Sequence, residues 1–252
     1  MEDIVIRYIE RPKLQDPIFI EGLPGIGNVG KLAAEHLKDE LKAVKFAEIY
    51  SKYFPPQVLV LDDGLIRLVQ NELYYVRRDS KGDIVLLVGD YQGLTPEGQY
   101  ELADFVLGEL KKLGVHRLFT LGGYGMGRIV TKPRVLGAAT DAALVKEMET
   151  HGVVFARGEP GAGIVGASGL LLGLGKMHGV QAVCLMGETS GYFVDPKSAQ
   201  AVLEVLTKVL GLTIDFSELE SKAKQIDQIT SKLRDVDRVE EPQGKEDLGY
   251  IG

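Results

Sequence analysis

A glycine-rich segment near the start of the chain has the spacing of a nucleotide-binding loop. It reads Gly-Leu-Pro-Gly-Ile-Gly-Asn-Val-Gly from Gly22 to Gly30, after a strand-like run and before a stretch of helical period. In a nucleotide-binding loop, Gly25, Gly27 and Gly30 would let backbone amides approach a pyrophosphate at the helix N-terminus. Glu48, on the next predicted strand, would then bind a ribose hydroxyl.

The same segment also suits a purely structural role. Its proline removes one amide donor, and no Lys-Ser or Lys-Thr pair follows, as it does in a phosphate-binding P-loop. Glycines in a tight strand-to-helix turn permit close packing of the helix on the sheet. The residues alone leave both interpretations open, and both rest on one set: Gly22, Pro24, Gly25, Gly27, Asn28 and Gly30.

Side chains that could perform catalysis are sparse. The four histidines have neither the i, i+4 spacing nor the neighbouring cysteine of a metal site, and we expect surface or capping roles for them: His36, His116, His151 and His178. Cys184 lies in an apolar strand, where a thiol is typically inert. Ser168 lacks the full Gly-x-Ser-x-Gly context of a nucleophile turn. The sequence therefore predicts no catalytic residue, no metal ligands and no cofactor.

The composition is that of a globular protein. The chain has 252 residues, of which 45% are hydrophobic and 26% charged, enough for one large domain with a packed core. A net charge of -7 without a basic stripe argues against binding to nucleic acid or anionic lipid. The single cysteine cannot form an internal disulfide, and neither a signal-peptide pattern nor a membrane-length apolar run is present. We expect a cytoplasmic protein that binds neither nucleic acid nor membranes.

Short β-branched runs alternate with longer stretches of helical period, which predicts an α/β protein with a three-layer α/β/α sandwich. The predicted strands are residues 5–9, 18–21, 43–49, 58–61, 65–69, 73–77, 84–89, 117–121, 152–156 and 182–186. Short turn-prone pieces separate the runs within residues 58–77 and indicate a meander there. We therefore expect a mixed sheet.

Helix boundaries are marked by capping residues. The predicted helices are residues 29–42, 96–113, 134–150, 167–178, 196–210 and 218–236. Thr95 and Asp195 each precede a proline, which is the order of an N-cap residue and the first helical position. Gly114, Gly152 and Gly211 follow periodic segments and suit helix C-termini, where a positive φ is needed.

The last predicted helix has a narrower apolar stripe than the others. Leu219, Ile226 and Leu233 recur every seven residues, and Ser217 with Glu220 has the spacing of a capping box. Such a stripe either docks on the protein's own sheet or contacts a helix of another subunit. Both interpretations stay open.

The end of the chain is acidic and contains few apolar residues until its last five positions. Residues 237–252 hold five acidic and two basic side chains, so they cannot bury enough surface to offset the entropy of ordering. Leu248, Tyr250 and Ile251 then form an apolar end, which suits either a tethered binding peptide or a tail that packs on its own domain. The sequence thus predicts an α/β domain over residues 1–214, a helix over 215–236 and a flexible tail over 237–252.

Four motifs together resemble the proteasome-assembly-chaperone family, with the closest likeness to its archaeal members. They are the Gly22 to Gly30 segment, Gly89-Asp90-Tyr91-Gln92, Gly122-Gly123-Tyr124 and Gly187-Glu188-Thr189-Ser190-Gly191, and the resemblance covers residues 17–210. It implies an α/β fold related in architecture to the nucleoside phosphorylases, without their activity. It also implies oligomers and a role in assembling the proteasome core particle.

The resemblance also concerns the tail. Some members of the family carry a C-terminal signal of hydrophobic residue, tyrosine and any residue, which inserts into pockets between proteasome α-subunits. Here Ile251 is next to last and Tyr250 is third from the end, so the tail either binds in a shifted register or does not bind those pockets.

Two functions are therefore in competition, and a scaffold with a partner other than the proteasome is a third interpretation that the sequence leaves open. The first is a non-enzymatic chaperone or scaffold that binds the α-subunits of the core particle, partly through Leu248, Tyr250 and Ile251. As the resemblance implies, it would act as a homo-oligomer or together with a second related chaperone subunit. The alternative is an enzyme that binds a nucleotide or nucleoside at the glycine-rich loops.

Overall fold

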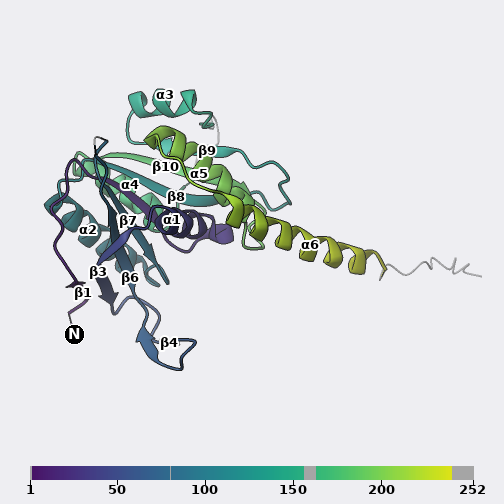
Figure 1. The fold of residues 1–252 in the computed structure, drawn as a ribbon, viewed down its shortest axis with the longest axis horizontal. Helices are drawn as coiled ribbons and strands as arrows, with labels where there is room; N and C mark the ends of the chain where they lie inside the picture. Colours follow the sequence, from purple (N-terminus) through teal and green to yellow (C-terminus); the bar gives the residue numbers. More distant parts are fainter. Residues whose placement is uncertain (1, 80, 156–162, 240–252) are drawn as a thin grey trace, which may run out of the picture.

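The computed structural model describes residues 2–79, 81–155 and 163–239, with residues 229–239 as backbone only. Within these residues an eight-stranded sheet forms the centre of the molecule (Figure 1). In spatial order its strands are β1 (Ile4–Tyr8), β3 (Val44–Ser51), β6 (Asn71–Val76), β7 (Ile84–Gly89), β2 (Ile18–Gly22), β8 (Arg117–Gly125), β10 (Gln181–Thr189) and β9 (Val135–Ala139). The strands β7, β2, β8 and β10 are parallel, and the others pair antiparallel, so the predicted mixed sheet is confirmed.

Helices cover both faces of the sheet. One face carries α1 (Val29–Glu40), α3 (Ala142–Thr150) and α5 (Pro196–Leu210), and the other carries α2 (Pro96–Lys112) and α4 (Ala167–Met177). Successive side chains of a strand point to opposite faces, so Phe19 enters the core under α2 and α4 while Ile20 enters the core under α1 and α5. The predicted three-layer α/β/α sandwich is confirmed.

Local sequence signals fix several helix ends. The Thr95 side chain accepts the Gly98 N–H at 3.0 Å, and the Asp195 side chain accepts the Ser198 N–H at 3.0 Å, so both predicted N-caps are present. Gly211 ends α5 with a φ of 61°. The predicted capping box at Ser217 does not form, because Asp215 accepts the hydroxyl and the N–H of Ser217 instead.

Two predicted elements are wrong. The first half of the predicted helix 134–150 is the edge strand β9, because this stretch pairs with β10 and the pairing outweighs helix propensity. The helix α3 begins only at Ala142, after its N-cap Asp141. Among the described residues of the predicted strand 152–156, only one bridge forms, between Leu136 and Val154.

The predicted meander is divided between two sheets. The strands β4 (Val58–Val60) and β5 (Ile66–Leu68) form a separate two-stranded hairpin, and β6 alone joins the main sheet. The hairpin projects from the body of the molecule (Figure 1). The helix α6 (Ser217–Val239) also projects from the body, in a different direction.

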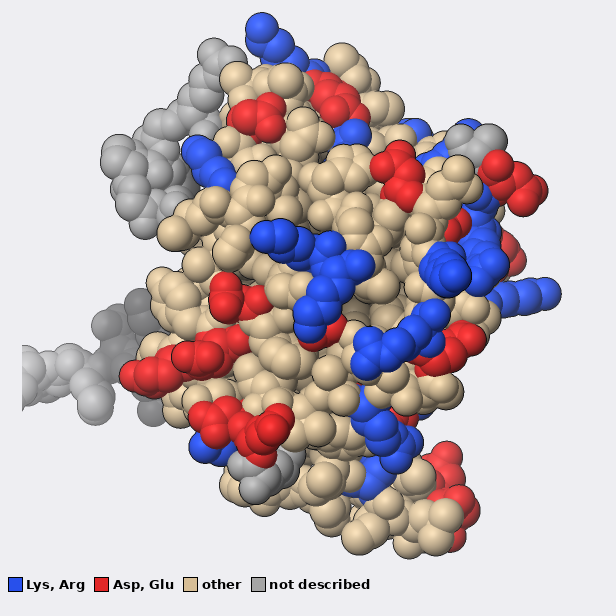
Figure 2. Space-filling view, turned by 90° about the vertical axis from the view of Figure 1, so that its left-hand side faces the viewer, with Lys and Arg blue, Asp and Glu red and all other residues tan. Residues whose placement is uncertain are grey.

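The charged side chains are dispersed. Figure 2 shows lysine and arginine side chains in small groups next to acidic ones on one face of the molecule, without a broad basic field. In the part of the chain that the structure describes, no helix has the length and apolar character needed to cross a membrane.

The seat of α1 on the sheet gives a testable prediction about stability. A Cβ atom added at Gly30 would lie 2.0 Å from the carbonyl oxygen of Leu121 in β8, so Gly30→Ala must shift the helix or the strand. We expect a loss of about 1–3 kcal/mol in the free energy of unfolding, measured by denaturant titration. The matched control is Gly108→Ala in α2, where no atom lies within 4 Å of the added carbon, and we expect a gain of up to about 1 kcal/mol there. Equal effects of the two changes would contradict the packing argument.

Candidate functional site

The glycine-rich segment connects β2 to α1 through a tight turn at the carboxyl ends of the central strands. Gly22 ends β2, a short 3-10 turn follows over Ile26–Asn28, and Gly27 and Asn28 have φ values of 61° and 50°. A Cβ atom at Gly123 would lie 2.3 Å from the carbonyl oxygen of Ile26. The turn therefore rests directly on the backbone of β8.

Several polar groups of this turn bond to the protein itself. The Leu23 N–H donates to Glu21 at 2.9 Å, and the Asn28 N–H donates to the Gly25 carbonyl at 2.9 Å. The Pro24 carbonyl accepts from the Gln92 side chain at 2.7 Å. These bonds and the close approach to β8 support the structural interpretation of the glycines, in which they let α1 pack on the sheet.

The structure brings together all four motifs on which the family resemblance rests. The Gln92 amide joins Pro24 to α4, because its oxygen also accepts the Ala167 N–H at 2.9 Å. On the other side of the turn, a Cβ atom at Gly27 would lie 2.8 Å from the Thr189 hydroxyl. The motifs come from four parallel strands, whose carboxyl ends meet at one edge of the sheet. They form a packed junction around the start of α1.

A buried carboxyl group lies beneath this junction and was not singled out from the sequence. Glu21 is 0% exposed, and its second oxygen accepts the Ser168 hydroxyl at 3.0 Å. Burial raises the pKa of Glu21 to about 7, while the bonds from Leu23 and Ser168 oppose the rise. The signal in the sequence was a glutamate that ends an apolar strand run. The hydrogen bond from Ser168 ties β2 to α4. Because the carboxyl group is fully enclosed, it does not face solvent or a pocket where a substrate could bind.

The other side chains that could take part in catalysis are buried or are held by contacts within the protein. Cys184 is buried, and burial raises the pKa of its thiol to about 12. Arg134, immediately before β9, donates to the buried Glu188 of β10, with 3.0 Å between Nε and Oε1. That bond and the charge of Arg134 hold the pKa of Glu188 below its ordinary value. Among the described residues, no three His, Cys, Asp or Glu side chains lie close enough together to hold a metal ion.

His36 departs from the expected surface role. It is buried on α1, and its Nε2 lies 2.7 Å from the Asp215 carbonyl oxygen. Its ring stacks on Phe216 with 6.2 Å between centroids, and the Asp215 N–H donates to Glu40 at 2.9 Å. These contacts fix the segment that leads into α6 on the side of α1.

The first turns of α6 are anchored on the domain, and the remainder extends beyond it. Leu219 and Ala223 are buried in contact with the side of α5, and Lys197 forms an ion pair with Asp227 at 2.6 Å. The helix then runs away from the body (Figure 1). The apolar stripe of α6 therefore begins by docking on the protein's own domain, on a helix and not on the sheet.

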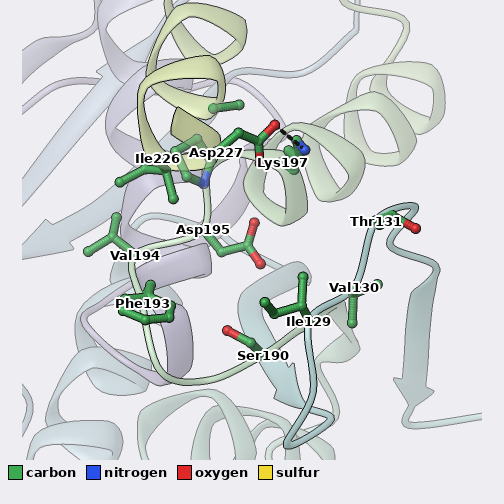
Figure 3. Close-up of a pocket in the computed structure, with 12 residues that line it drawn as sticks. Ile129, Val130, Thr131, Ser190, Phe193, Val194, Asp195, Lys197, Ile226 and Asp227 are labelled. Atoms are coloured by element: carbon green, nitrogen blue, oxygen red, sulfur yellow. Dashed lines mark ion pairs between the residues drawn. The ribbon is translucent and has the colours of Figure 1, made fainter. Parts of the chain in front are cut away.

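A hollow lies at the root of α6 (Figure 3). It has a volume of about 300 Å³ and lies between the β8–β9 loop, the loop before α5, and α6 itself. Ile129, Phe193 and Val194 supply exposed apolar walls, and the Lys197–Asp227 ion pair bridges two of its sides. The hollow separates the anchored root of α6 from the neighbouring loops.

The predicted partner-binding residues lie farther along the chain. Leu248, Tyr250 and Ile251 belong to residues 240–252, which lie outside the described residues. In the sequence they lie nine or more residues beyond Val239, the last residue of α6. The site that the structure does describe is therefore the anchored root and projecting backbone of the helix that precedes them.

These features define an α/β/α protein whose strand-end junction is packed and whose C-terminal helix projects from the body. The chain belongs to the PAC2 family, whose model matches residues 19–234. It is 44% identical to PbaB of Pyrococcus furiosus, described as an archaeal proteasome activator, with a TM-score of 0.89 over 93% of this chain and 100% of that chain. PbaA of the same organism, an archaeal homolog of proteasome-assembly chaperone, is 30% identical with a TM-score of 0.76, over 92% of this chain and 93% of that chain.

The similarity extends to a methanogen. The protein MJ1210 of Methanocaldococcus jannaschii is 41% identical over 245 residues, which cover 95% of this chain and 93% of that protein. The family resemblance expected from the four motifs is confirmed, and archaeal relatives are among the matches. The relationship in architecture to nucleoside phosphorylases stays a prediction.

The buried Glu21 predicts a pH dependence of stability. Its pKa in the folded protein, about 7, exceeds its ordinary value of 4.5, so the folded state favours the protonated carboxyl. The contribution of Glu21 to the free energy of unfolding is fully present below pH 4.5, and it is lost as the pH rises to about 7. Glu21→Gln stays neutral, so we expect it to exceed the parent in stability at pH 8 by on the order of 2 kcal/mol, with little difference at pH 4. Denaturant titrations at both pH values measure this, and a constant difference would contradict it.

The docking of α6 gives a second prediction. Leu219→Ser removes a buried apolar side chain from the contact with α5, at a cost of about 2–4 kcal/mol to that contact. We expect the amides of residues 217–228 to exchange hydrogen at least tenfold faster, while those of α2 keep their rates. Glu220→Ser, an exposed position on the same turn, is the control. Equal exchange in the two variants would show that α6 is held by other contacts.

Proposed function

We propose that this protein is a cytoplasmic chaperone or scaffold that assists assembly of the proteasome core particle by binding its α-subunits. Family membership supports a non-enzymatic role of this kind, because PbaA and PbaB are described through proteasome assembly and activation. The observation that carries the proposal is the likeness to PbaB, at 44% identity and a TM-score of 0.89 over nearly the whole chain. The packed junction at the strand ends agrees with it.

The projecting helix supports a role for the C-terminal tail. From Asp227 to Val239 the helix rises by about 18 Å, at 1.5 Å per residue. Residues 240–252 can add up to roughly 40 Å when extended. Leu248, Tyr250 and Ile251 therefore have the reach to enter a pocket of a partner while the α/β/α domain stays outside it.

The proposed mechanism is tethered docking by a homo-oligomer. A short apolar peptide with one aromatic ring binds weakly by itself. Several copies carried by one oligomer act together, because binding of the first raises the effective concentration of the next. The anchored root of α6 would limit the directions in which each arm projects and so favour simultaneous binding.

Deletion of residues 248–252 tests the role of the tail. We expect the truncated protein to lose at least tenfold in affinity for proteasome α-subunits, because both the ring and the aliphatic anchors are gone. The circular dichroism spectrum and the number of subunits, measured by native mass spectrometry, should not change, since the deleted residues lie beyond α6. Surface plasmon resonance against purified α-subunits measures the affinity.

A matched variant keeps the length and removes only the ring. Tyr250→Ser should reproduce most of the loss, whereas Glu241→Gln, in the same tail, should retain the parental affinity within about twofold. Unchanged affinity of the truncated protein would reject the tail and assign any binding to the folded domain. Absence of binding by the full-length chain would reject the proposed function itself.

A further inference from the structure

The hollow at the root of α6 presents apolar side chains that the described part of the chain leaves uncovered. Figure 3 shows Ile129 and Phe193 on facing loops, with Ile226 of α6 above them. Ile129, Phe193 and the neighbouring Val194 have exposed fractions of 44%, 44% and 42%. Removal of such side chains from water is favourable. The hollow, at about 300 Å³, therefore suits a few apolar side chains of an occupant.

The walls of the hollow are held by hydrogen bonds within the domain. The Met126 N–H donates to the Thr189 carbonyl at 2.8 Å, which fixes the start of the loop between β8 and β9. The Asp195 N–H donates to the Gly27 carbonyl at 2.9 Å, and the Asp195 carboxylate caps α5. An occupant would therefore not have to order either loop, and binding avoids the entropy that such ordering costs.

The loop that forms one wall is basic. Residues 126–134, between β8 and β9, contain Arg128, Lys132 and Arg134 and no acidic residue. Arg128 and Lys132 are exposed, whereas Arg134 donates to Glu188. A local excess of positive charge attracts a negatively charged segment. The hollow is thus apolar inside and basic along one rim.

A segment of this same chain has the complementary composition. Residues 240–247 contain four acidic residues and one basic residue, and Leu248, Tyr250 and Ile251 follow them. An occupant with this order would place its apolar side chains between the walls of the hollow and its acidic side chains beside the basic loop. Both parts of the hollow would then be matched by one short stretch of sequence.

The chain is long enough to bring this segment back to the hollow. The helix α6 passes the hollow at Asp227 and ends at Val239, about 18 Å farther along at 1.5 Å per residue. Residues 240–247 span roughly 26 Å when extended, at about 3.3 Å per residue. The sequence Glu-Pro-Gln-Gly over residues 241–244 has proline and glycine at the positions that a type I turn favours, and such a turn reverses the chain. The segment therefore meets the length requirement for docking on the domain that carries it.

We propose that the hollow at the root of α6 is the docking site for Leu248, Tyr250 and Ile251 of the same chain, which occupy it when no partner is bound. The three apolar side chains fill the space between Ile129 and Phe193, and the acidic residues before them lie beside the basic loop. A tethered segment has a high effective concentration at its own domain, so a weak contact of this kind is populated.

The docked segment would regulate the proposed function, and this consequence rests on that function. Leu248, Tyr250 and Ile251 are the residues that we propose for binding the α-subunits, and they can occupy only one pocket at a time. Docking in the hollow therefore reduces the apparent affinity for the α-subunits to the undocked fraction of its intrinsic value. A partner that binds tightly enough displaces the segment from the hollow.

Tryptophan fluorescence tests the docking in the full-length protein without any partner. The chain has no tryptophan, so Tyr250→Trp supplies a single reporter in the docking segment. The reference is a synthetic peptide of residues 240–252 with the same substitution. We expect acrylamide to quench the protein at least about threefold less strongly than the peptide, because only the undocked fraction is accessible to the quencher. The emission maximum should also lie at a shorter wavelength. Equal quenching of protein and peptide would overturn the proposal.

Variants of the hollow locate the docking site in this reporter protein. Ile129→Asp should raise quenching to the level of the peptide, because it places a charge in the apolar wall. Lys132→Glu should raise quenching in part, since it repels the acidic residues of the segment. Leu94→Asp, at a 61% exposed position in the groove between α2 and α4, is the matched control and should change nothing. Release by Leu94→Asp and not by Ile129→Asp would overturn the proposal.

Mixed samples distinguish docking within one chain from docking on a neighbouring copy. The reporter chain is produced together with an excess of Ile129→Asp chains that contain no tryptophan. We expect the reporter to stay protected from acrylamide, because the hollow of its own chain is intact. Quenching at the level of the peptide would show that the segment enters the hollow of another copy, and would overturn the proposal.

Surface plasmon resonance tests the consequence for binding. Ile129→Asp with Tyr250 unchanged should bind purified α-subunits at least about threefold more tightly than the parent, since docking no longer competes. An unchanged affinity would overturn the competition between the two sites. Absence of binding by parent and variant alike would reject the proposed function, whereas the fluorescence of the protein alone would still decide the docking.

Discussion

The close contact between α1 and the central strands is the constraint on which the other features depend. It exists because Gly22 and Gly30 have no side chains: a Cβ atom at either would lie 2.3 Å or less from a neighbouring atom. The helix seated in this way carries His36 and Glu40, which bond the Asp215 backbone before α6. It also packs against α5, which supports the root of α6. The glycine turn therefore helps to position the segment that leads into α6, together with the contacts of α6 on α5.

The same junction explains why motifs that look like an enzyme's loops need not belong to one. In many α/β enzymes the carboxyl ends of parallel strands leave a crevice for a ligand. Here the backbone from Ile26 to Asn28 rests on β8, and Gln92 links Pro24 to α4. Beneath it the Glu21 carboxyl group is enclosed and bonded to Ser168. The fold thus uses glycines, amides and a buried acid for packing, in agreement with membership of the PAC2 family.

What distinguishes this chain from a closed globular domain is its two projections. The hairpin is tied to the body through Leu59 and Arg67 and carries exposed aliphatic side chains beyond these contacts, and α6 is fixed at its root and extends beyond the domain. Both projections leave surface exposed that a compact domain would cover. Both are suited to contact with other proteins, one through its exposed apolar side chains and the other through its reach.

Local features of the chain were enough to predict the alternation of strands and helices, the N-caps at Thr95 and Asp195, and the family, because these depend on local periodicity, on short-range hydrogen bonds and on motif order. Contacts between distant segments made residues 135–139 a strand instead of the predicted helix. Such contacts also left the apolar residues of the hairpin exposed and buried His36 against Asp215. Residues with the same local preference can face the core or solvent. Which of the two occurs depends on pairing between segments far apart in the chain, as with β9 on β10 or α1 beneath the start of α6.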